Sequence, residues 1–504
     1  MQVIKDSFWL EENEKRNINK LEKDIKIDIA IIGGGITGLT TALLLSEYGM
    51  EVAVFEGYEI GYGATGHTTA KVTSQHGIIY SELVKCYNDG TAKKYADANE
   101  NAIKNIKRII DKYHIDCDYQ TVKSNLYASD KDNVDKLFKE YSAAKSVGLP
   151  ASCTSNISLP FKTHASLTLS DQGMMHPKKY ADGIANALKK HKVKIYEHTR
   201  IIKIDEGNTY VLNTDCSIKI EADTVVIATK YPIINKKGMF FTKLHVERSY
   251  VVAASLPNFN LDGYYINVEK NVRSIRPYSL GKESLILIAG ANHEAGECND
   301  TEKPYADLIK FAEEIDPDAK IKYRWSTQDC ITLDKIPYIG KLSKDMPNVY
   351  LATGFNKWGM THSMVAGIII SDDIMNKKNP YSDIYDPTRS LNLVAAKELI
   401  VQGADVAADY LKIIKPEKTK DIDKIVRGEG EIININGDSV GVFKDENNNV
   451  FMVNPKCSHM GCLLSFNKAE RSWDCPCHGS RFSYLGEIID SPAVKTIQMI
   501  KGKE

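Results

Sequence analysis

The chain has 504 residues, with 65 Lys and Arg against 66 Asp and Glu and a pI near 6.9. This balance argues against a protein that holds nucleic acid by bulk positive charge, and 43% hydrophobic residues are typical of a globular chain. No segment reaches the about 18 apolar residues of a membrane span, and residues 1–20 lack the order of a signal peptide. We therefore expect a cytoplasmic protein with no membrane span.

The first predicted elements form a strand, helix, strand unit. Residues 27–32 (IDIAII) read as a buried strand that ends in glycines, residues 36–48 have leucines at helical spacing, and residues 51–56 (EVAVFE) form a second strand. Two longer helices are predicted over residues 91–113 and 130–147, and we expect them in a cap or substrate lobe.

Further strands are predicted along the middle of the chain, at residues 193–196, 201–204, 224–228, 250–254, 285–288 and 349–352. Both short turns and helices separate them, which favours a mixed α/β and antiparallel architecture. Residues 392–411 have a helical pattern and lead into a Lys-rich linker with Pro416. Short strands and turns follow from residue 425 onward, which indicates a small all-β module.

A G-x-G-x-x-G motif, Gly33, Gly35 and Gly38, lies between the first strand and helix, and Glu56 ends the next strand. Glycines at these positions allow a tight turn and let a pyrophosphate approach the helix N-terminus. The acidic residue accepts hydrogen bonds from the adenosine ribose. The combination predicts a dinucleotide site, but it does not choose between FAD and NAD.

Three further segments narrow the choice: residues 61–69 (GYGATGHTT), 222–229 (ADTVVIAT) and 352–361 (ATGFNKWGMT). Together they resemble the D-amino-acid oxidase or glycine-oxidase-like superfamily of FAD-dependent oxidoreductases, over roughly residues 25–375. The resemblance implies FAD as the cofactor and a backbone that faces the pyrimidine edge of the flavin, where negative charge develops on reduction. The positions that it implies at FAD are Ala64, Thr65, Arg200, Ile201, Gly354, Trp358, Gly359, Met360 and Thr361.

His67 lies near the position of a histidine that is covalently bonded to the flavin in relatives such as dimethylglycine dehydrogenase. Here the sequence is Gly63-Ala64-Thr65-Gly66-His67. A histidine that lies near the flavin without a covalent bond, or in a satisfied loop contact, is the interpretation we favour.

The substrate is harder to infer. Sarcosine-oxidase-like relatives clamp a substrate carboxylate with an Arg and a Lys, and this chain has Ala70 beside Lys71, and Thr361, at those places. Arg276, Tyr265 and His362 are the candidate catalytic residues, with Tyr250 as a further one, although surface charge or packing explains each equally well. Amine oxidation mainly needs a neutral amine held over the flavin, so a missing acid–base motif does not exclude it.

The strongest motif pairs Cys457-Ser458-His459 with Cys475-Pro476-Cys477-His478. Two Cys and two His in C-x-H and C-x-x-H pairs are what a Rieske 2Fe-2S centre requires. Zinc is disfavoured because its ligand pairs are usually spaced more widely. The C-terminal residues resemble a Rieske domain, which implies Cys457, His459, Cys475 and His478 as ligands and places Cys462 and Cys477 where relatives form a disulfide.

The predicted fold is an α/β FAD-binding, Rossmann-like domain with an α+β substrate lobe and a small C-terminal all-β Rieske domain. We expect it to oxidise a small-molecule amine or amino-acid-like substrate and pass electrons through the cluster to an external acceptor, a protein or a quinone. An oxygen-using amine oxidase and a redox sensor or electron carrier without turnover are the alternatives. The predicted ranges are 1–390 for the oxidoreductase domain (FAD-binding parts near 25–75, 180–235 and 330–375; substrate lobe near 76–179 and 236–329), 391–424 for a helix and linker, and 425–504 for the Rieske domain.

Overall fold

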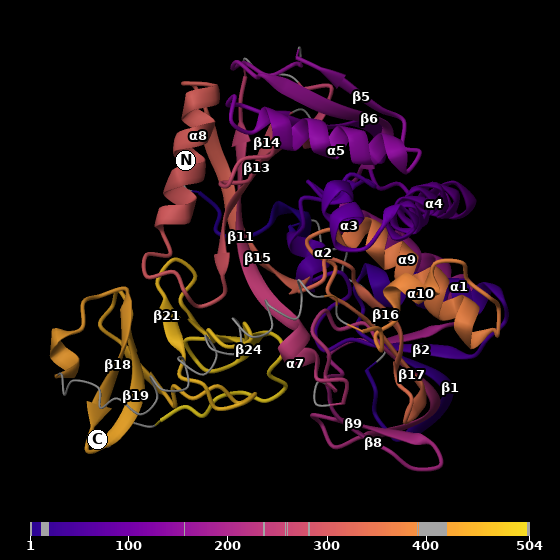
Figure 1. Cartoon of the computed structure of the whole chain (residues 1–504). Helices are drawn as coiled ribbons and strands as arrows, with labels where there is room; N and C mark the ends of the chain where they lie inside the picture. Colours follow the sequence, from indigo (N-terminus) through magenta and orange to yellow (C-terminus); the bar gives the residue numbers. More distant parts are fainter. Residues whose placement is uncertain are drawn as a thin grey trace.

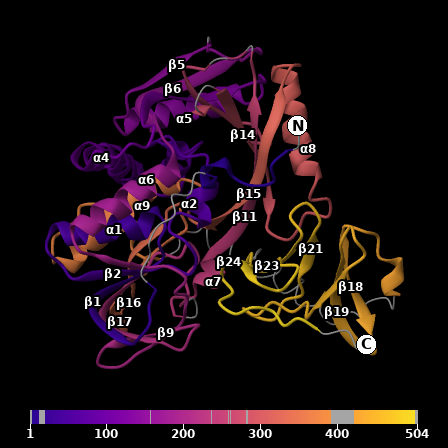
Figure 2. The same cartoon turned by 180° about the vertical axis from the view of Figure 1, so that it is seen from behind.

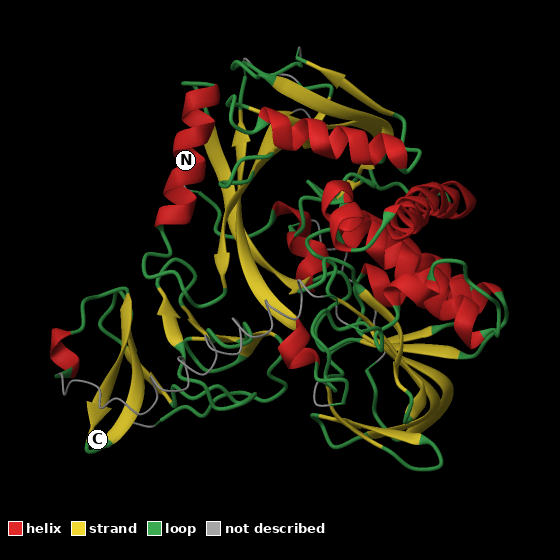
Figure 3. Cartoon of the chain, viewed as in Figure 1, coloured by secondary structure: helices red, strands yellow, loops and turns green. Residues whose placement is uncertain are grey.

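The computed structural model describes residues 3–11, 20–155, 157–234, 237–257, 259, 261–280, 283–390, 392 and 421–500. Two large sheets and their helices form residues 3–390, which we call the body, and two small sheets form residues 421–500, the C-terminal module (Figures 1 and 3). Most of the helix and linker predicted over residues 391–424 lies outside the described residues.

The first large sheet is the Rossmann-like one. Its central strand β1 runs parallel to β10 and β2, and the strand order is β16-β17-β10-β1-β2-β7, with β8 and β9 as an antiparallel extension. Residues of β1 alternate between two cores, one on each face, as a buried parallel strand requires. The strands are β1 (Ile25–Ile32), β2 (Val52–Phe55), β7 (Lys194–Tyr196), β8 (Ile201–Asp205), β9 (Tyr210–Thr214), β10 (Lys219–Ile227), β16 (Tyr338–Ser343) and β17 (Met346–Thr353).

Helices cover one face of this sheet, and Figure 2 shows α1, α6 and α9 side by side there. The helix predicted over residues 91–113 is α4, and it packs against α9. The helices are η1 (Phe8–Leu10), α1 (Ile36–Glu47), α2 (Gly63–His67), α3 (Tyr80–Cys86), α4 (Asp89–Tyr113), α5 (Val134–Ser146), α6 (Pro177–Lys190), α7 (Phe240–Lys243), α8 (Lys303–Ile315), α9 (Gly359–Ile374), α10 (Ser382–Tyr385) and η2 (Ile422–Lys424).

The second sheet is mainly antiparallel, in the order β15-β11-β14-β13-β12-β4-β6-β3, with β5 beside β6. Alternate residues of β11 pack under α8 and against η1, which buries both faces of the strand. The strands are β3 (Lys71–Val72), β4 (Gln120–Ala128), β5 (Ala151–Thr154), β6 (Ala165–Met174), β11 (Leu244–Ser255), β12 (Gly263–Asn267), β13 (Arg273–Leu280), β14 (Glu283–Glu294) and β15 (Lys320–Thr332).

The C-terminal module has a three-stranded and a four-stranded antiparallel sheet around a core that includes Trp473 and Phe443. The predicted fold class is thereby confirmed. No helix among the described residues combines the length and apolar character that crossing a membrane requires. The strands are β18 (Glu429–Ile435), β19 (Asp438–Lys444), β20 (Val450–Val453), β21 (Ser465–Asn467), β22 (Ser472–Asp474), β23 (Arg481–Ser483) and β24 (Ile488–Asp490).

A buried ion pair joins the module to the body. Arg248 on β11 donates to Asp474 on β22 over 2.6 Å, and the two side chains are 1% and 5% exposed. Burial alone would raise the pKa of Asp474, but Arg248 and Arg481 outweigh it and hold this pKa well below its usual range. Gln328 accepts from Arg248 over 2.8 Å and donates to the carbonyl of Gly479 over 2.7 Å. The network therefore fixes the module on the N-terminal part of β11 and the C-terminal part of β15.

Replacing Arg248 by Met should destabilise the docked module by about 1.5–3 kcal/mol, because the buried carboxylate of Asp474 keeps Arg481 but loses a charged hydrogen-bond partner. Calorimetry should show the transition of the module at lower temperature, and adding Asp474→Asn should recover part of the loss. Lys123→Met, which breaks an exposed ion pair with Asp262, is the control and should cost less than about 1 kcal/mol. An unchanged transition in Arg248→Met would contradict this role.

Candidate functional site

A cavity of about 370 Å³ runs along the carboxyl edge of the parallel sheet. The segments that follow β1, β2, β10 and β17 all contribute to its wall, which is where open parallel sheets bind ligands. The second sheet lines the opposite side with residues of β11, β13, β14 and β15. An elongated ligand can therefore lie between the two sheets.

Two glycines of the first motif shape the turn before α1. A Cβ atom on Gly33, whose φ is +109°, would lie 2.5 Å from the carbonyl oxygen of Ala228, and one on Gly38 would lie 2.0 Å from that of Gly33. Both positions thus require glycine. Thr65 accepts a hydrogen bond from the backbone N–H of Ile36 over 3.2 Å at the helix N-terminus, where the helix dipole favours an anion.

Glu56 is held beside this turn. Its carboxylate oxygens accept from the backbone N–H groups of Gly34 over 2.6 Å and Tyr58 over 2.8 Å. Burial raises the pKa of Glu56, and these bonds oppose that shift. The guanidinium of Arg200 lies 4.5 Å from the ring centre of Tyr58 and completes this end of the cavity.

The structure brings most of the predicted FAD positions into one wall. Gly38 supports the turn, and Thr361 donates to the carbonyl of Thr73 over 3.1 Å; neither is among the cavity-lining residues. His67 does line the cavity, with Nδ1 2.8 Å from the carbonyl of Gly63. The predicted positions in the wall are Gly33, Gly35, Glu56, Ala64, Thr65, His67, Arg200, Ile201, Gly354, Trp358, Gly359 and Met360.

The three predicted catalytic residues are not among the described residues that line the cavity. Arg276 is buried and donates to the carbonyls of Thr69 and Met175, so it supports the loop behind the wall. The Tyr265 ring is buried in the core of the second sheet, and its hydroxyl donates to the half-exposed Asp262. His362 is buried behind Trp358, with Nδ1 3.3 Å from the carbonyl of Phe355.

Lys71 is a cavity-lining residue outside the predicted set. Its Nζ donates to the hydroxyls of Thr69 over 2.7 Å and Ser274 over 3.0 Å, and the side chain pairs with no carboxylate among the described residues. Burial and the nearby charge of Arg276 lower the pKa of Lys71 to about 7. The cavity therefore holds an amine that can bind or release a proton near neutral pH.

Tyr231 links the cavity to the C-terminal module. It lies in the loop after β10 and lines the cavity, while its ring centre lies 6.2 Å from that of His459 and 6.4 Å from that of His478. Residues 488–494 of the module also line the cavity. Lys230 pairs with Asp490 over 2.7 Å at the same place.

The two loops with the C-x-H and C-x-x-H motifs face each other. Cys457 and Cys475 are buried, and the His459 and His478 rings lie 5.0 Å apart at 89°. The buried Nδ1 of His478 has no hydrogen-bond partner in the described part of the chain. Burial lowers the pKa of both histidines to about 4, so their rings are neutral, as metal binding requires. The donor set fits a Rieske cluster.

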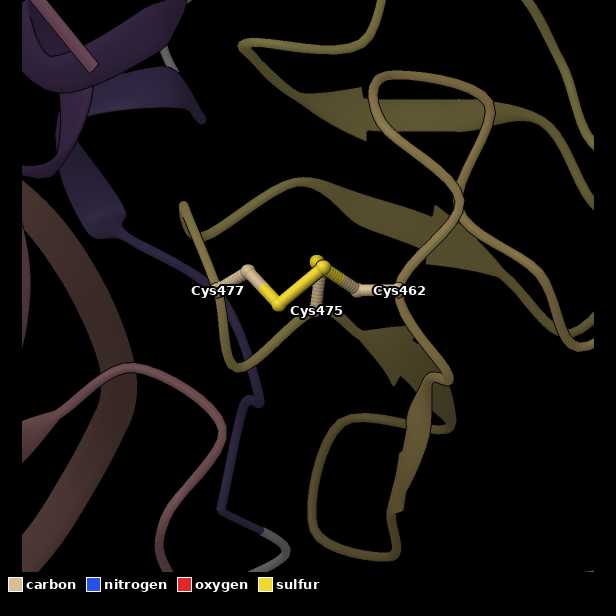
Figure 4. Close-up of side chains that lie close together, drawn as sticks. All are labelled: Cys462, Cys475 and Cys477. Atoms are coloured by element: carbon tan, nitrogen blue, oxygen red, sulfur yellow. A yellow bond between two sulfur atoms is a disulfide. The ribbon is translucent and has the colours of Figure 1, made fainter. Parts of the chain in front are cut away.

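Cys462 and Cys477 form a disulfide that joins the two loops (Figure 4). Their sulfur atoms lie within 4.8 Å of that of Cys475. Because both are bonded to each other, they are not thiolate ligands, and Cys475 and Cys457 remain for iron. The resemblance placed these two cysteines where relatives form a disulfide and left open whether this chain forms it; the structure contains the bond.

Comparisons with known proteins agree with this geometry. A family model described as FAD dependent oxidoreductase matches residues 28–372, and a Rieske [2Fe-2S] domain model matches residues 416–501. The chain belongs to the FAD-dependent oxidoreductase family. FAD and a 2Fe-2S cluster are its cofactors, and the helix N-termini, Glu56 and the four Cys and His residues fit them.

Three relatives illustrate the similarity. YhfW of Bacillus subtilis, named as a Rieske 2Fe-2S iron-sulfur protein, is 34% identical over 98% of this chain and 97% of its own. Gamma-glutamylputrescine oxidoreductase of Escherichia coli is 23% identical over 71% of this chain and 86% of its own. The structure of glycine oxidase from Geobacillus kaustophilus, at 19% identity, covers 73% of this chain and 99% of that one with a TM-score of 0.62.

Lys71→Met should stabilise the FAD-loaded protein at about pH 6 by a few degrees and have little effect above pH 10.5, the ordinary pKa of lysine. The unfolded chain binds the proton more tightly than the folded one, so stability rises with pH between about 7 and 10.5. Below about pH 7, Lys71 is protonated in both the folded and the unfolded chain, so its buried charge lowers the stability of the fold by the full amount. Thermal unfolding at several pH values measures the stability difference between Lys71→Met and the parent protein. Lys378→Met, at an exposed position, is the control. An equal effect at all pH values would contradict the lowered pKa.

Proposed function

We propose that this FAD-dependent oxidoreductase oxidises an amine or amino-acid-like substrate and passes the electrons through its Rieske cluster to an external acceptor, a protein or a quinone. The position of Tyr231 carries the proposal, because the same side chain lines the flavin cavity and contacts both cluster histidines. The names of the relatives, which include an amine derivative and glycine, support the substrate class.

The geometry supports the proposed cofactor residues. Cys457 and Cys475 would bind one iron, and His459 and His478 the other. The N-terminus of α1 would face the pyrophosphate of FAD, and that of α9 its pyrimidine edge.

When bound, FAD accepts two electrons as a hydride and can release them singly, and the cluster accepts one at a time. Oxidation removes the hydride from the carbon beside a neutral amine and leaves an iminium that water hydrolyses. The protein supplies position: Tyr231 fills the space between the two sites, and the Lys230–Asp490 and Arg248–Asp474 pairs hold the module against it. This packing keeps the transfer distance fixed.

Two observations favour an enzyme over a redox sensor. A redox sensor without turnover should expose the cluster histidines to a partner. His478 is instead only 5% exposed and packs toward the flavin cavity. The cavity also carries polar side chains from the second sheet, among them Lys71, Asn292 and Asp329. Such groups suit recognition of a substrate.

Anaerobic reduction with a panel of amines and amino acids tests the proposal. We expect one class of compound to bleach the flavin, and the EPR signal of the reduced cluster to rise afterwards. If only dithionite reduces both centres, the result contradicts the proposed enzyme and favours a redox sensor or electron carrier. If the flavin bleaches, the cluster stays oxidised and oxygen restores the colour, the chain is an oxygen-using oxidase.

Tyr231→Leu should slow the rise of the cluster signal and leave flavin bleaching by the substrate unchanged, because only the packing between the sites is lost. Tyr231→Phe is the matched control: the Tyr231 hydroxyl has no hydrogen-bond partner among the described residues, so its removal should leave both rates intact. Stopped-flow absorbance with rapid-freeze EPR separates the two steps. Equal cluster rates in Tyr231→Leu and the parent protein would contradict a route past this ring.

A further inference from the structure

Asp329 is a carboxylate that lines the cavity. It lies on β15 opposite Glu247 of β11, and together with Thr327 it faces the cavity from the second sheet. Gln328 between them bonds instead to Arg248 and Gly479. The carboxylate of Asp329 makes no hydrogen bond or ion pair among the described residues.

The two cations nearest to Asp329 have other partners. Lys357 pairs with Glu247 over 2.6 Å, and Lys230 pairs with Asp490 over 2.7 Å. Three carboxylates thus share two ammonium groups at this end of the cavity. His245, 3.5 Å from Glu247, adds a charge only when it is protonated.

One negative charge therefore remains unbalanced here. Burial raises the pKa of Asp329, which shows the cost of holding this charge without a partner, and Lys357 and Lys230 offset part of it. A cation that enters the cavity beside Asp329 would remove that cost. A ligand carboxylate at the same place would add a second unbalanced charge.

Lys71, a cavity-lining cation that pairs with no carboxylate among the described residues, is far from this place. Lys71 donates to Ser274 on β13, which lies in register with Ala289 on β14, Val251 on β11 and Trp325 on β15. Ser274 and Asp329 are therefore separated by three strand spacings and by four residues along β15. With ordinary strand spacing and rise, the separation is roughly 20 Å. An α-amino acid, whose charges sit on one carbon, cannot contact both.

We propose that Asp329 binds a charged ammonium group of the substrate, so that the substrate class is a diamine or polyamine with no carboxylate beside the oxidised nitrogen. One nitrogen stays charged against Asp329, and another, neutral, is oxidised. This inference rests on the proposed function and narrows its substrate.

Binding of ions that cannot be oxidised tests the inference without turnover. Purified holoenzyme is titrated with tetramethylammonium, and separately with acetate, while the flavin absorption spectrum is followed. We expect tetramethylammonium to perturb the spectrum, and Asp329→Asn to weaken this binding at least about ten-fold. Asp329→Glu, which keeps the charge, should retain most of it. Asp383→Asn removes a carboxylate from an exposed pair with Lys94 and should change nothing.

The outcomes separate this inference from the proposed function. Equal affinity of Asp329→Asn and the parent for tetramethylammonium, or a response to acetate alone, overturns the role of Asp329. In the anaerobic panel, we expect 1,4-diaminobutane to bleach the flavin faster than glycine. If amino acids bleach it and diamines do not, the inference fails while the proposed function stands. If no compound of either class bleaches it, the proposed function itself fails.

Discussion

The buried pair of Arg248 and Asp474 is the interaction on which the rest of the arrangement depends. A charged pair without water is stable only when both partners are present and further bonds satisfy them. Gln328 and Arg481 supply those bonds, so the C-terminal module has one well-defined position on the body. That position sets Tyr231 against His459 and His478 and brings residues 488–494 to the flavin cavity. The transfer route is therefore a consequence of how two folds dock.

Local sequence was sufficient for the parts of the site built from short segments. The glycine turn, Glu56 and the cluster motifs each occupy a few neighbouring residues, and their chemistry depends on spacing that the sequence displays. Arg276, Tyr265 and His362 illustrate the limit, since nothing in a strand or helix pattern tells whether a polar side chain faces the cavity or the core. Tyr231 had a usable signal, because it lies in the loop after a strand of the parallel sheet, whose carboxyl edge binds ligands. Asp329 had none, because its environment comes from three distant segments.

Charge inside the cavity is distributed unevenly between its ends. Among the residues that the structure describes, Lys71 has only hydroxyl partners, whereas Asp329 lies among carboxylates that already pair with the nearby lysines. The buried charge of either group lowers the stability of the protein without ligand, and a ligand of opposite charge restores that stability when it binds. Charges without an oppositely charged partner in the cavity are thus available to recognise a ligand.

The most direct test of the account is the order of electron transfer between the two centres of one molecule. Flash photoreduction of the flavin in anaerobic holoenzyme, followed by the absorbance of the cluster, measures it without any substrate. The account predicts that the cluster is reduced with a first-order rate that does not change with protein concentration. A rate that rises in proportion to concentration, or a cluster that stays oxidised, would contradict transfer across Tyr231 within the chain.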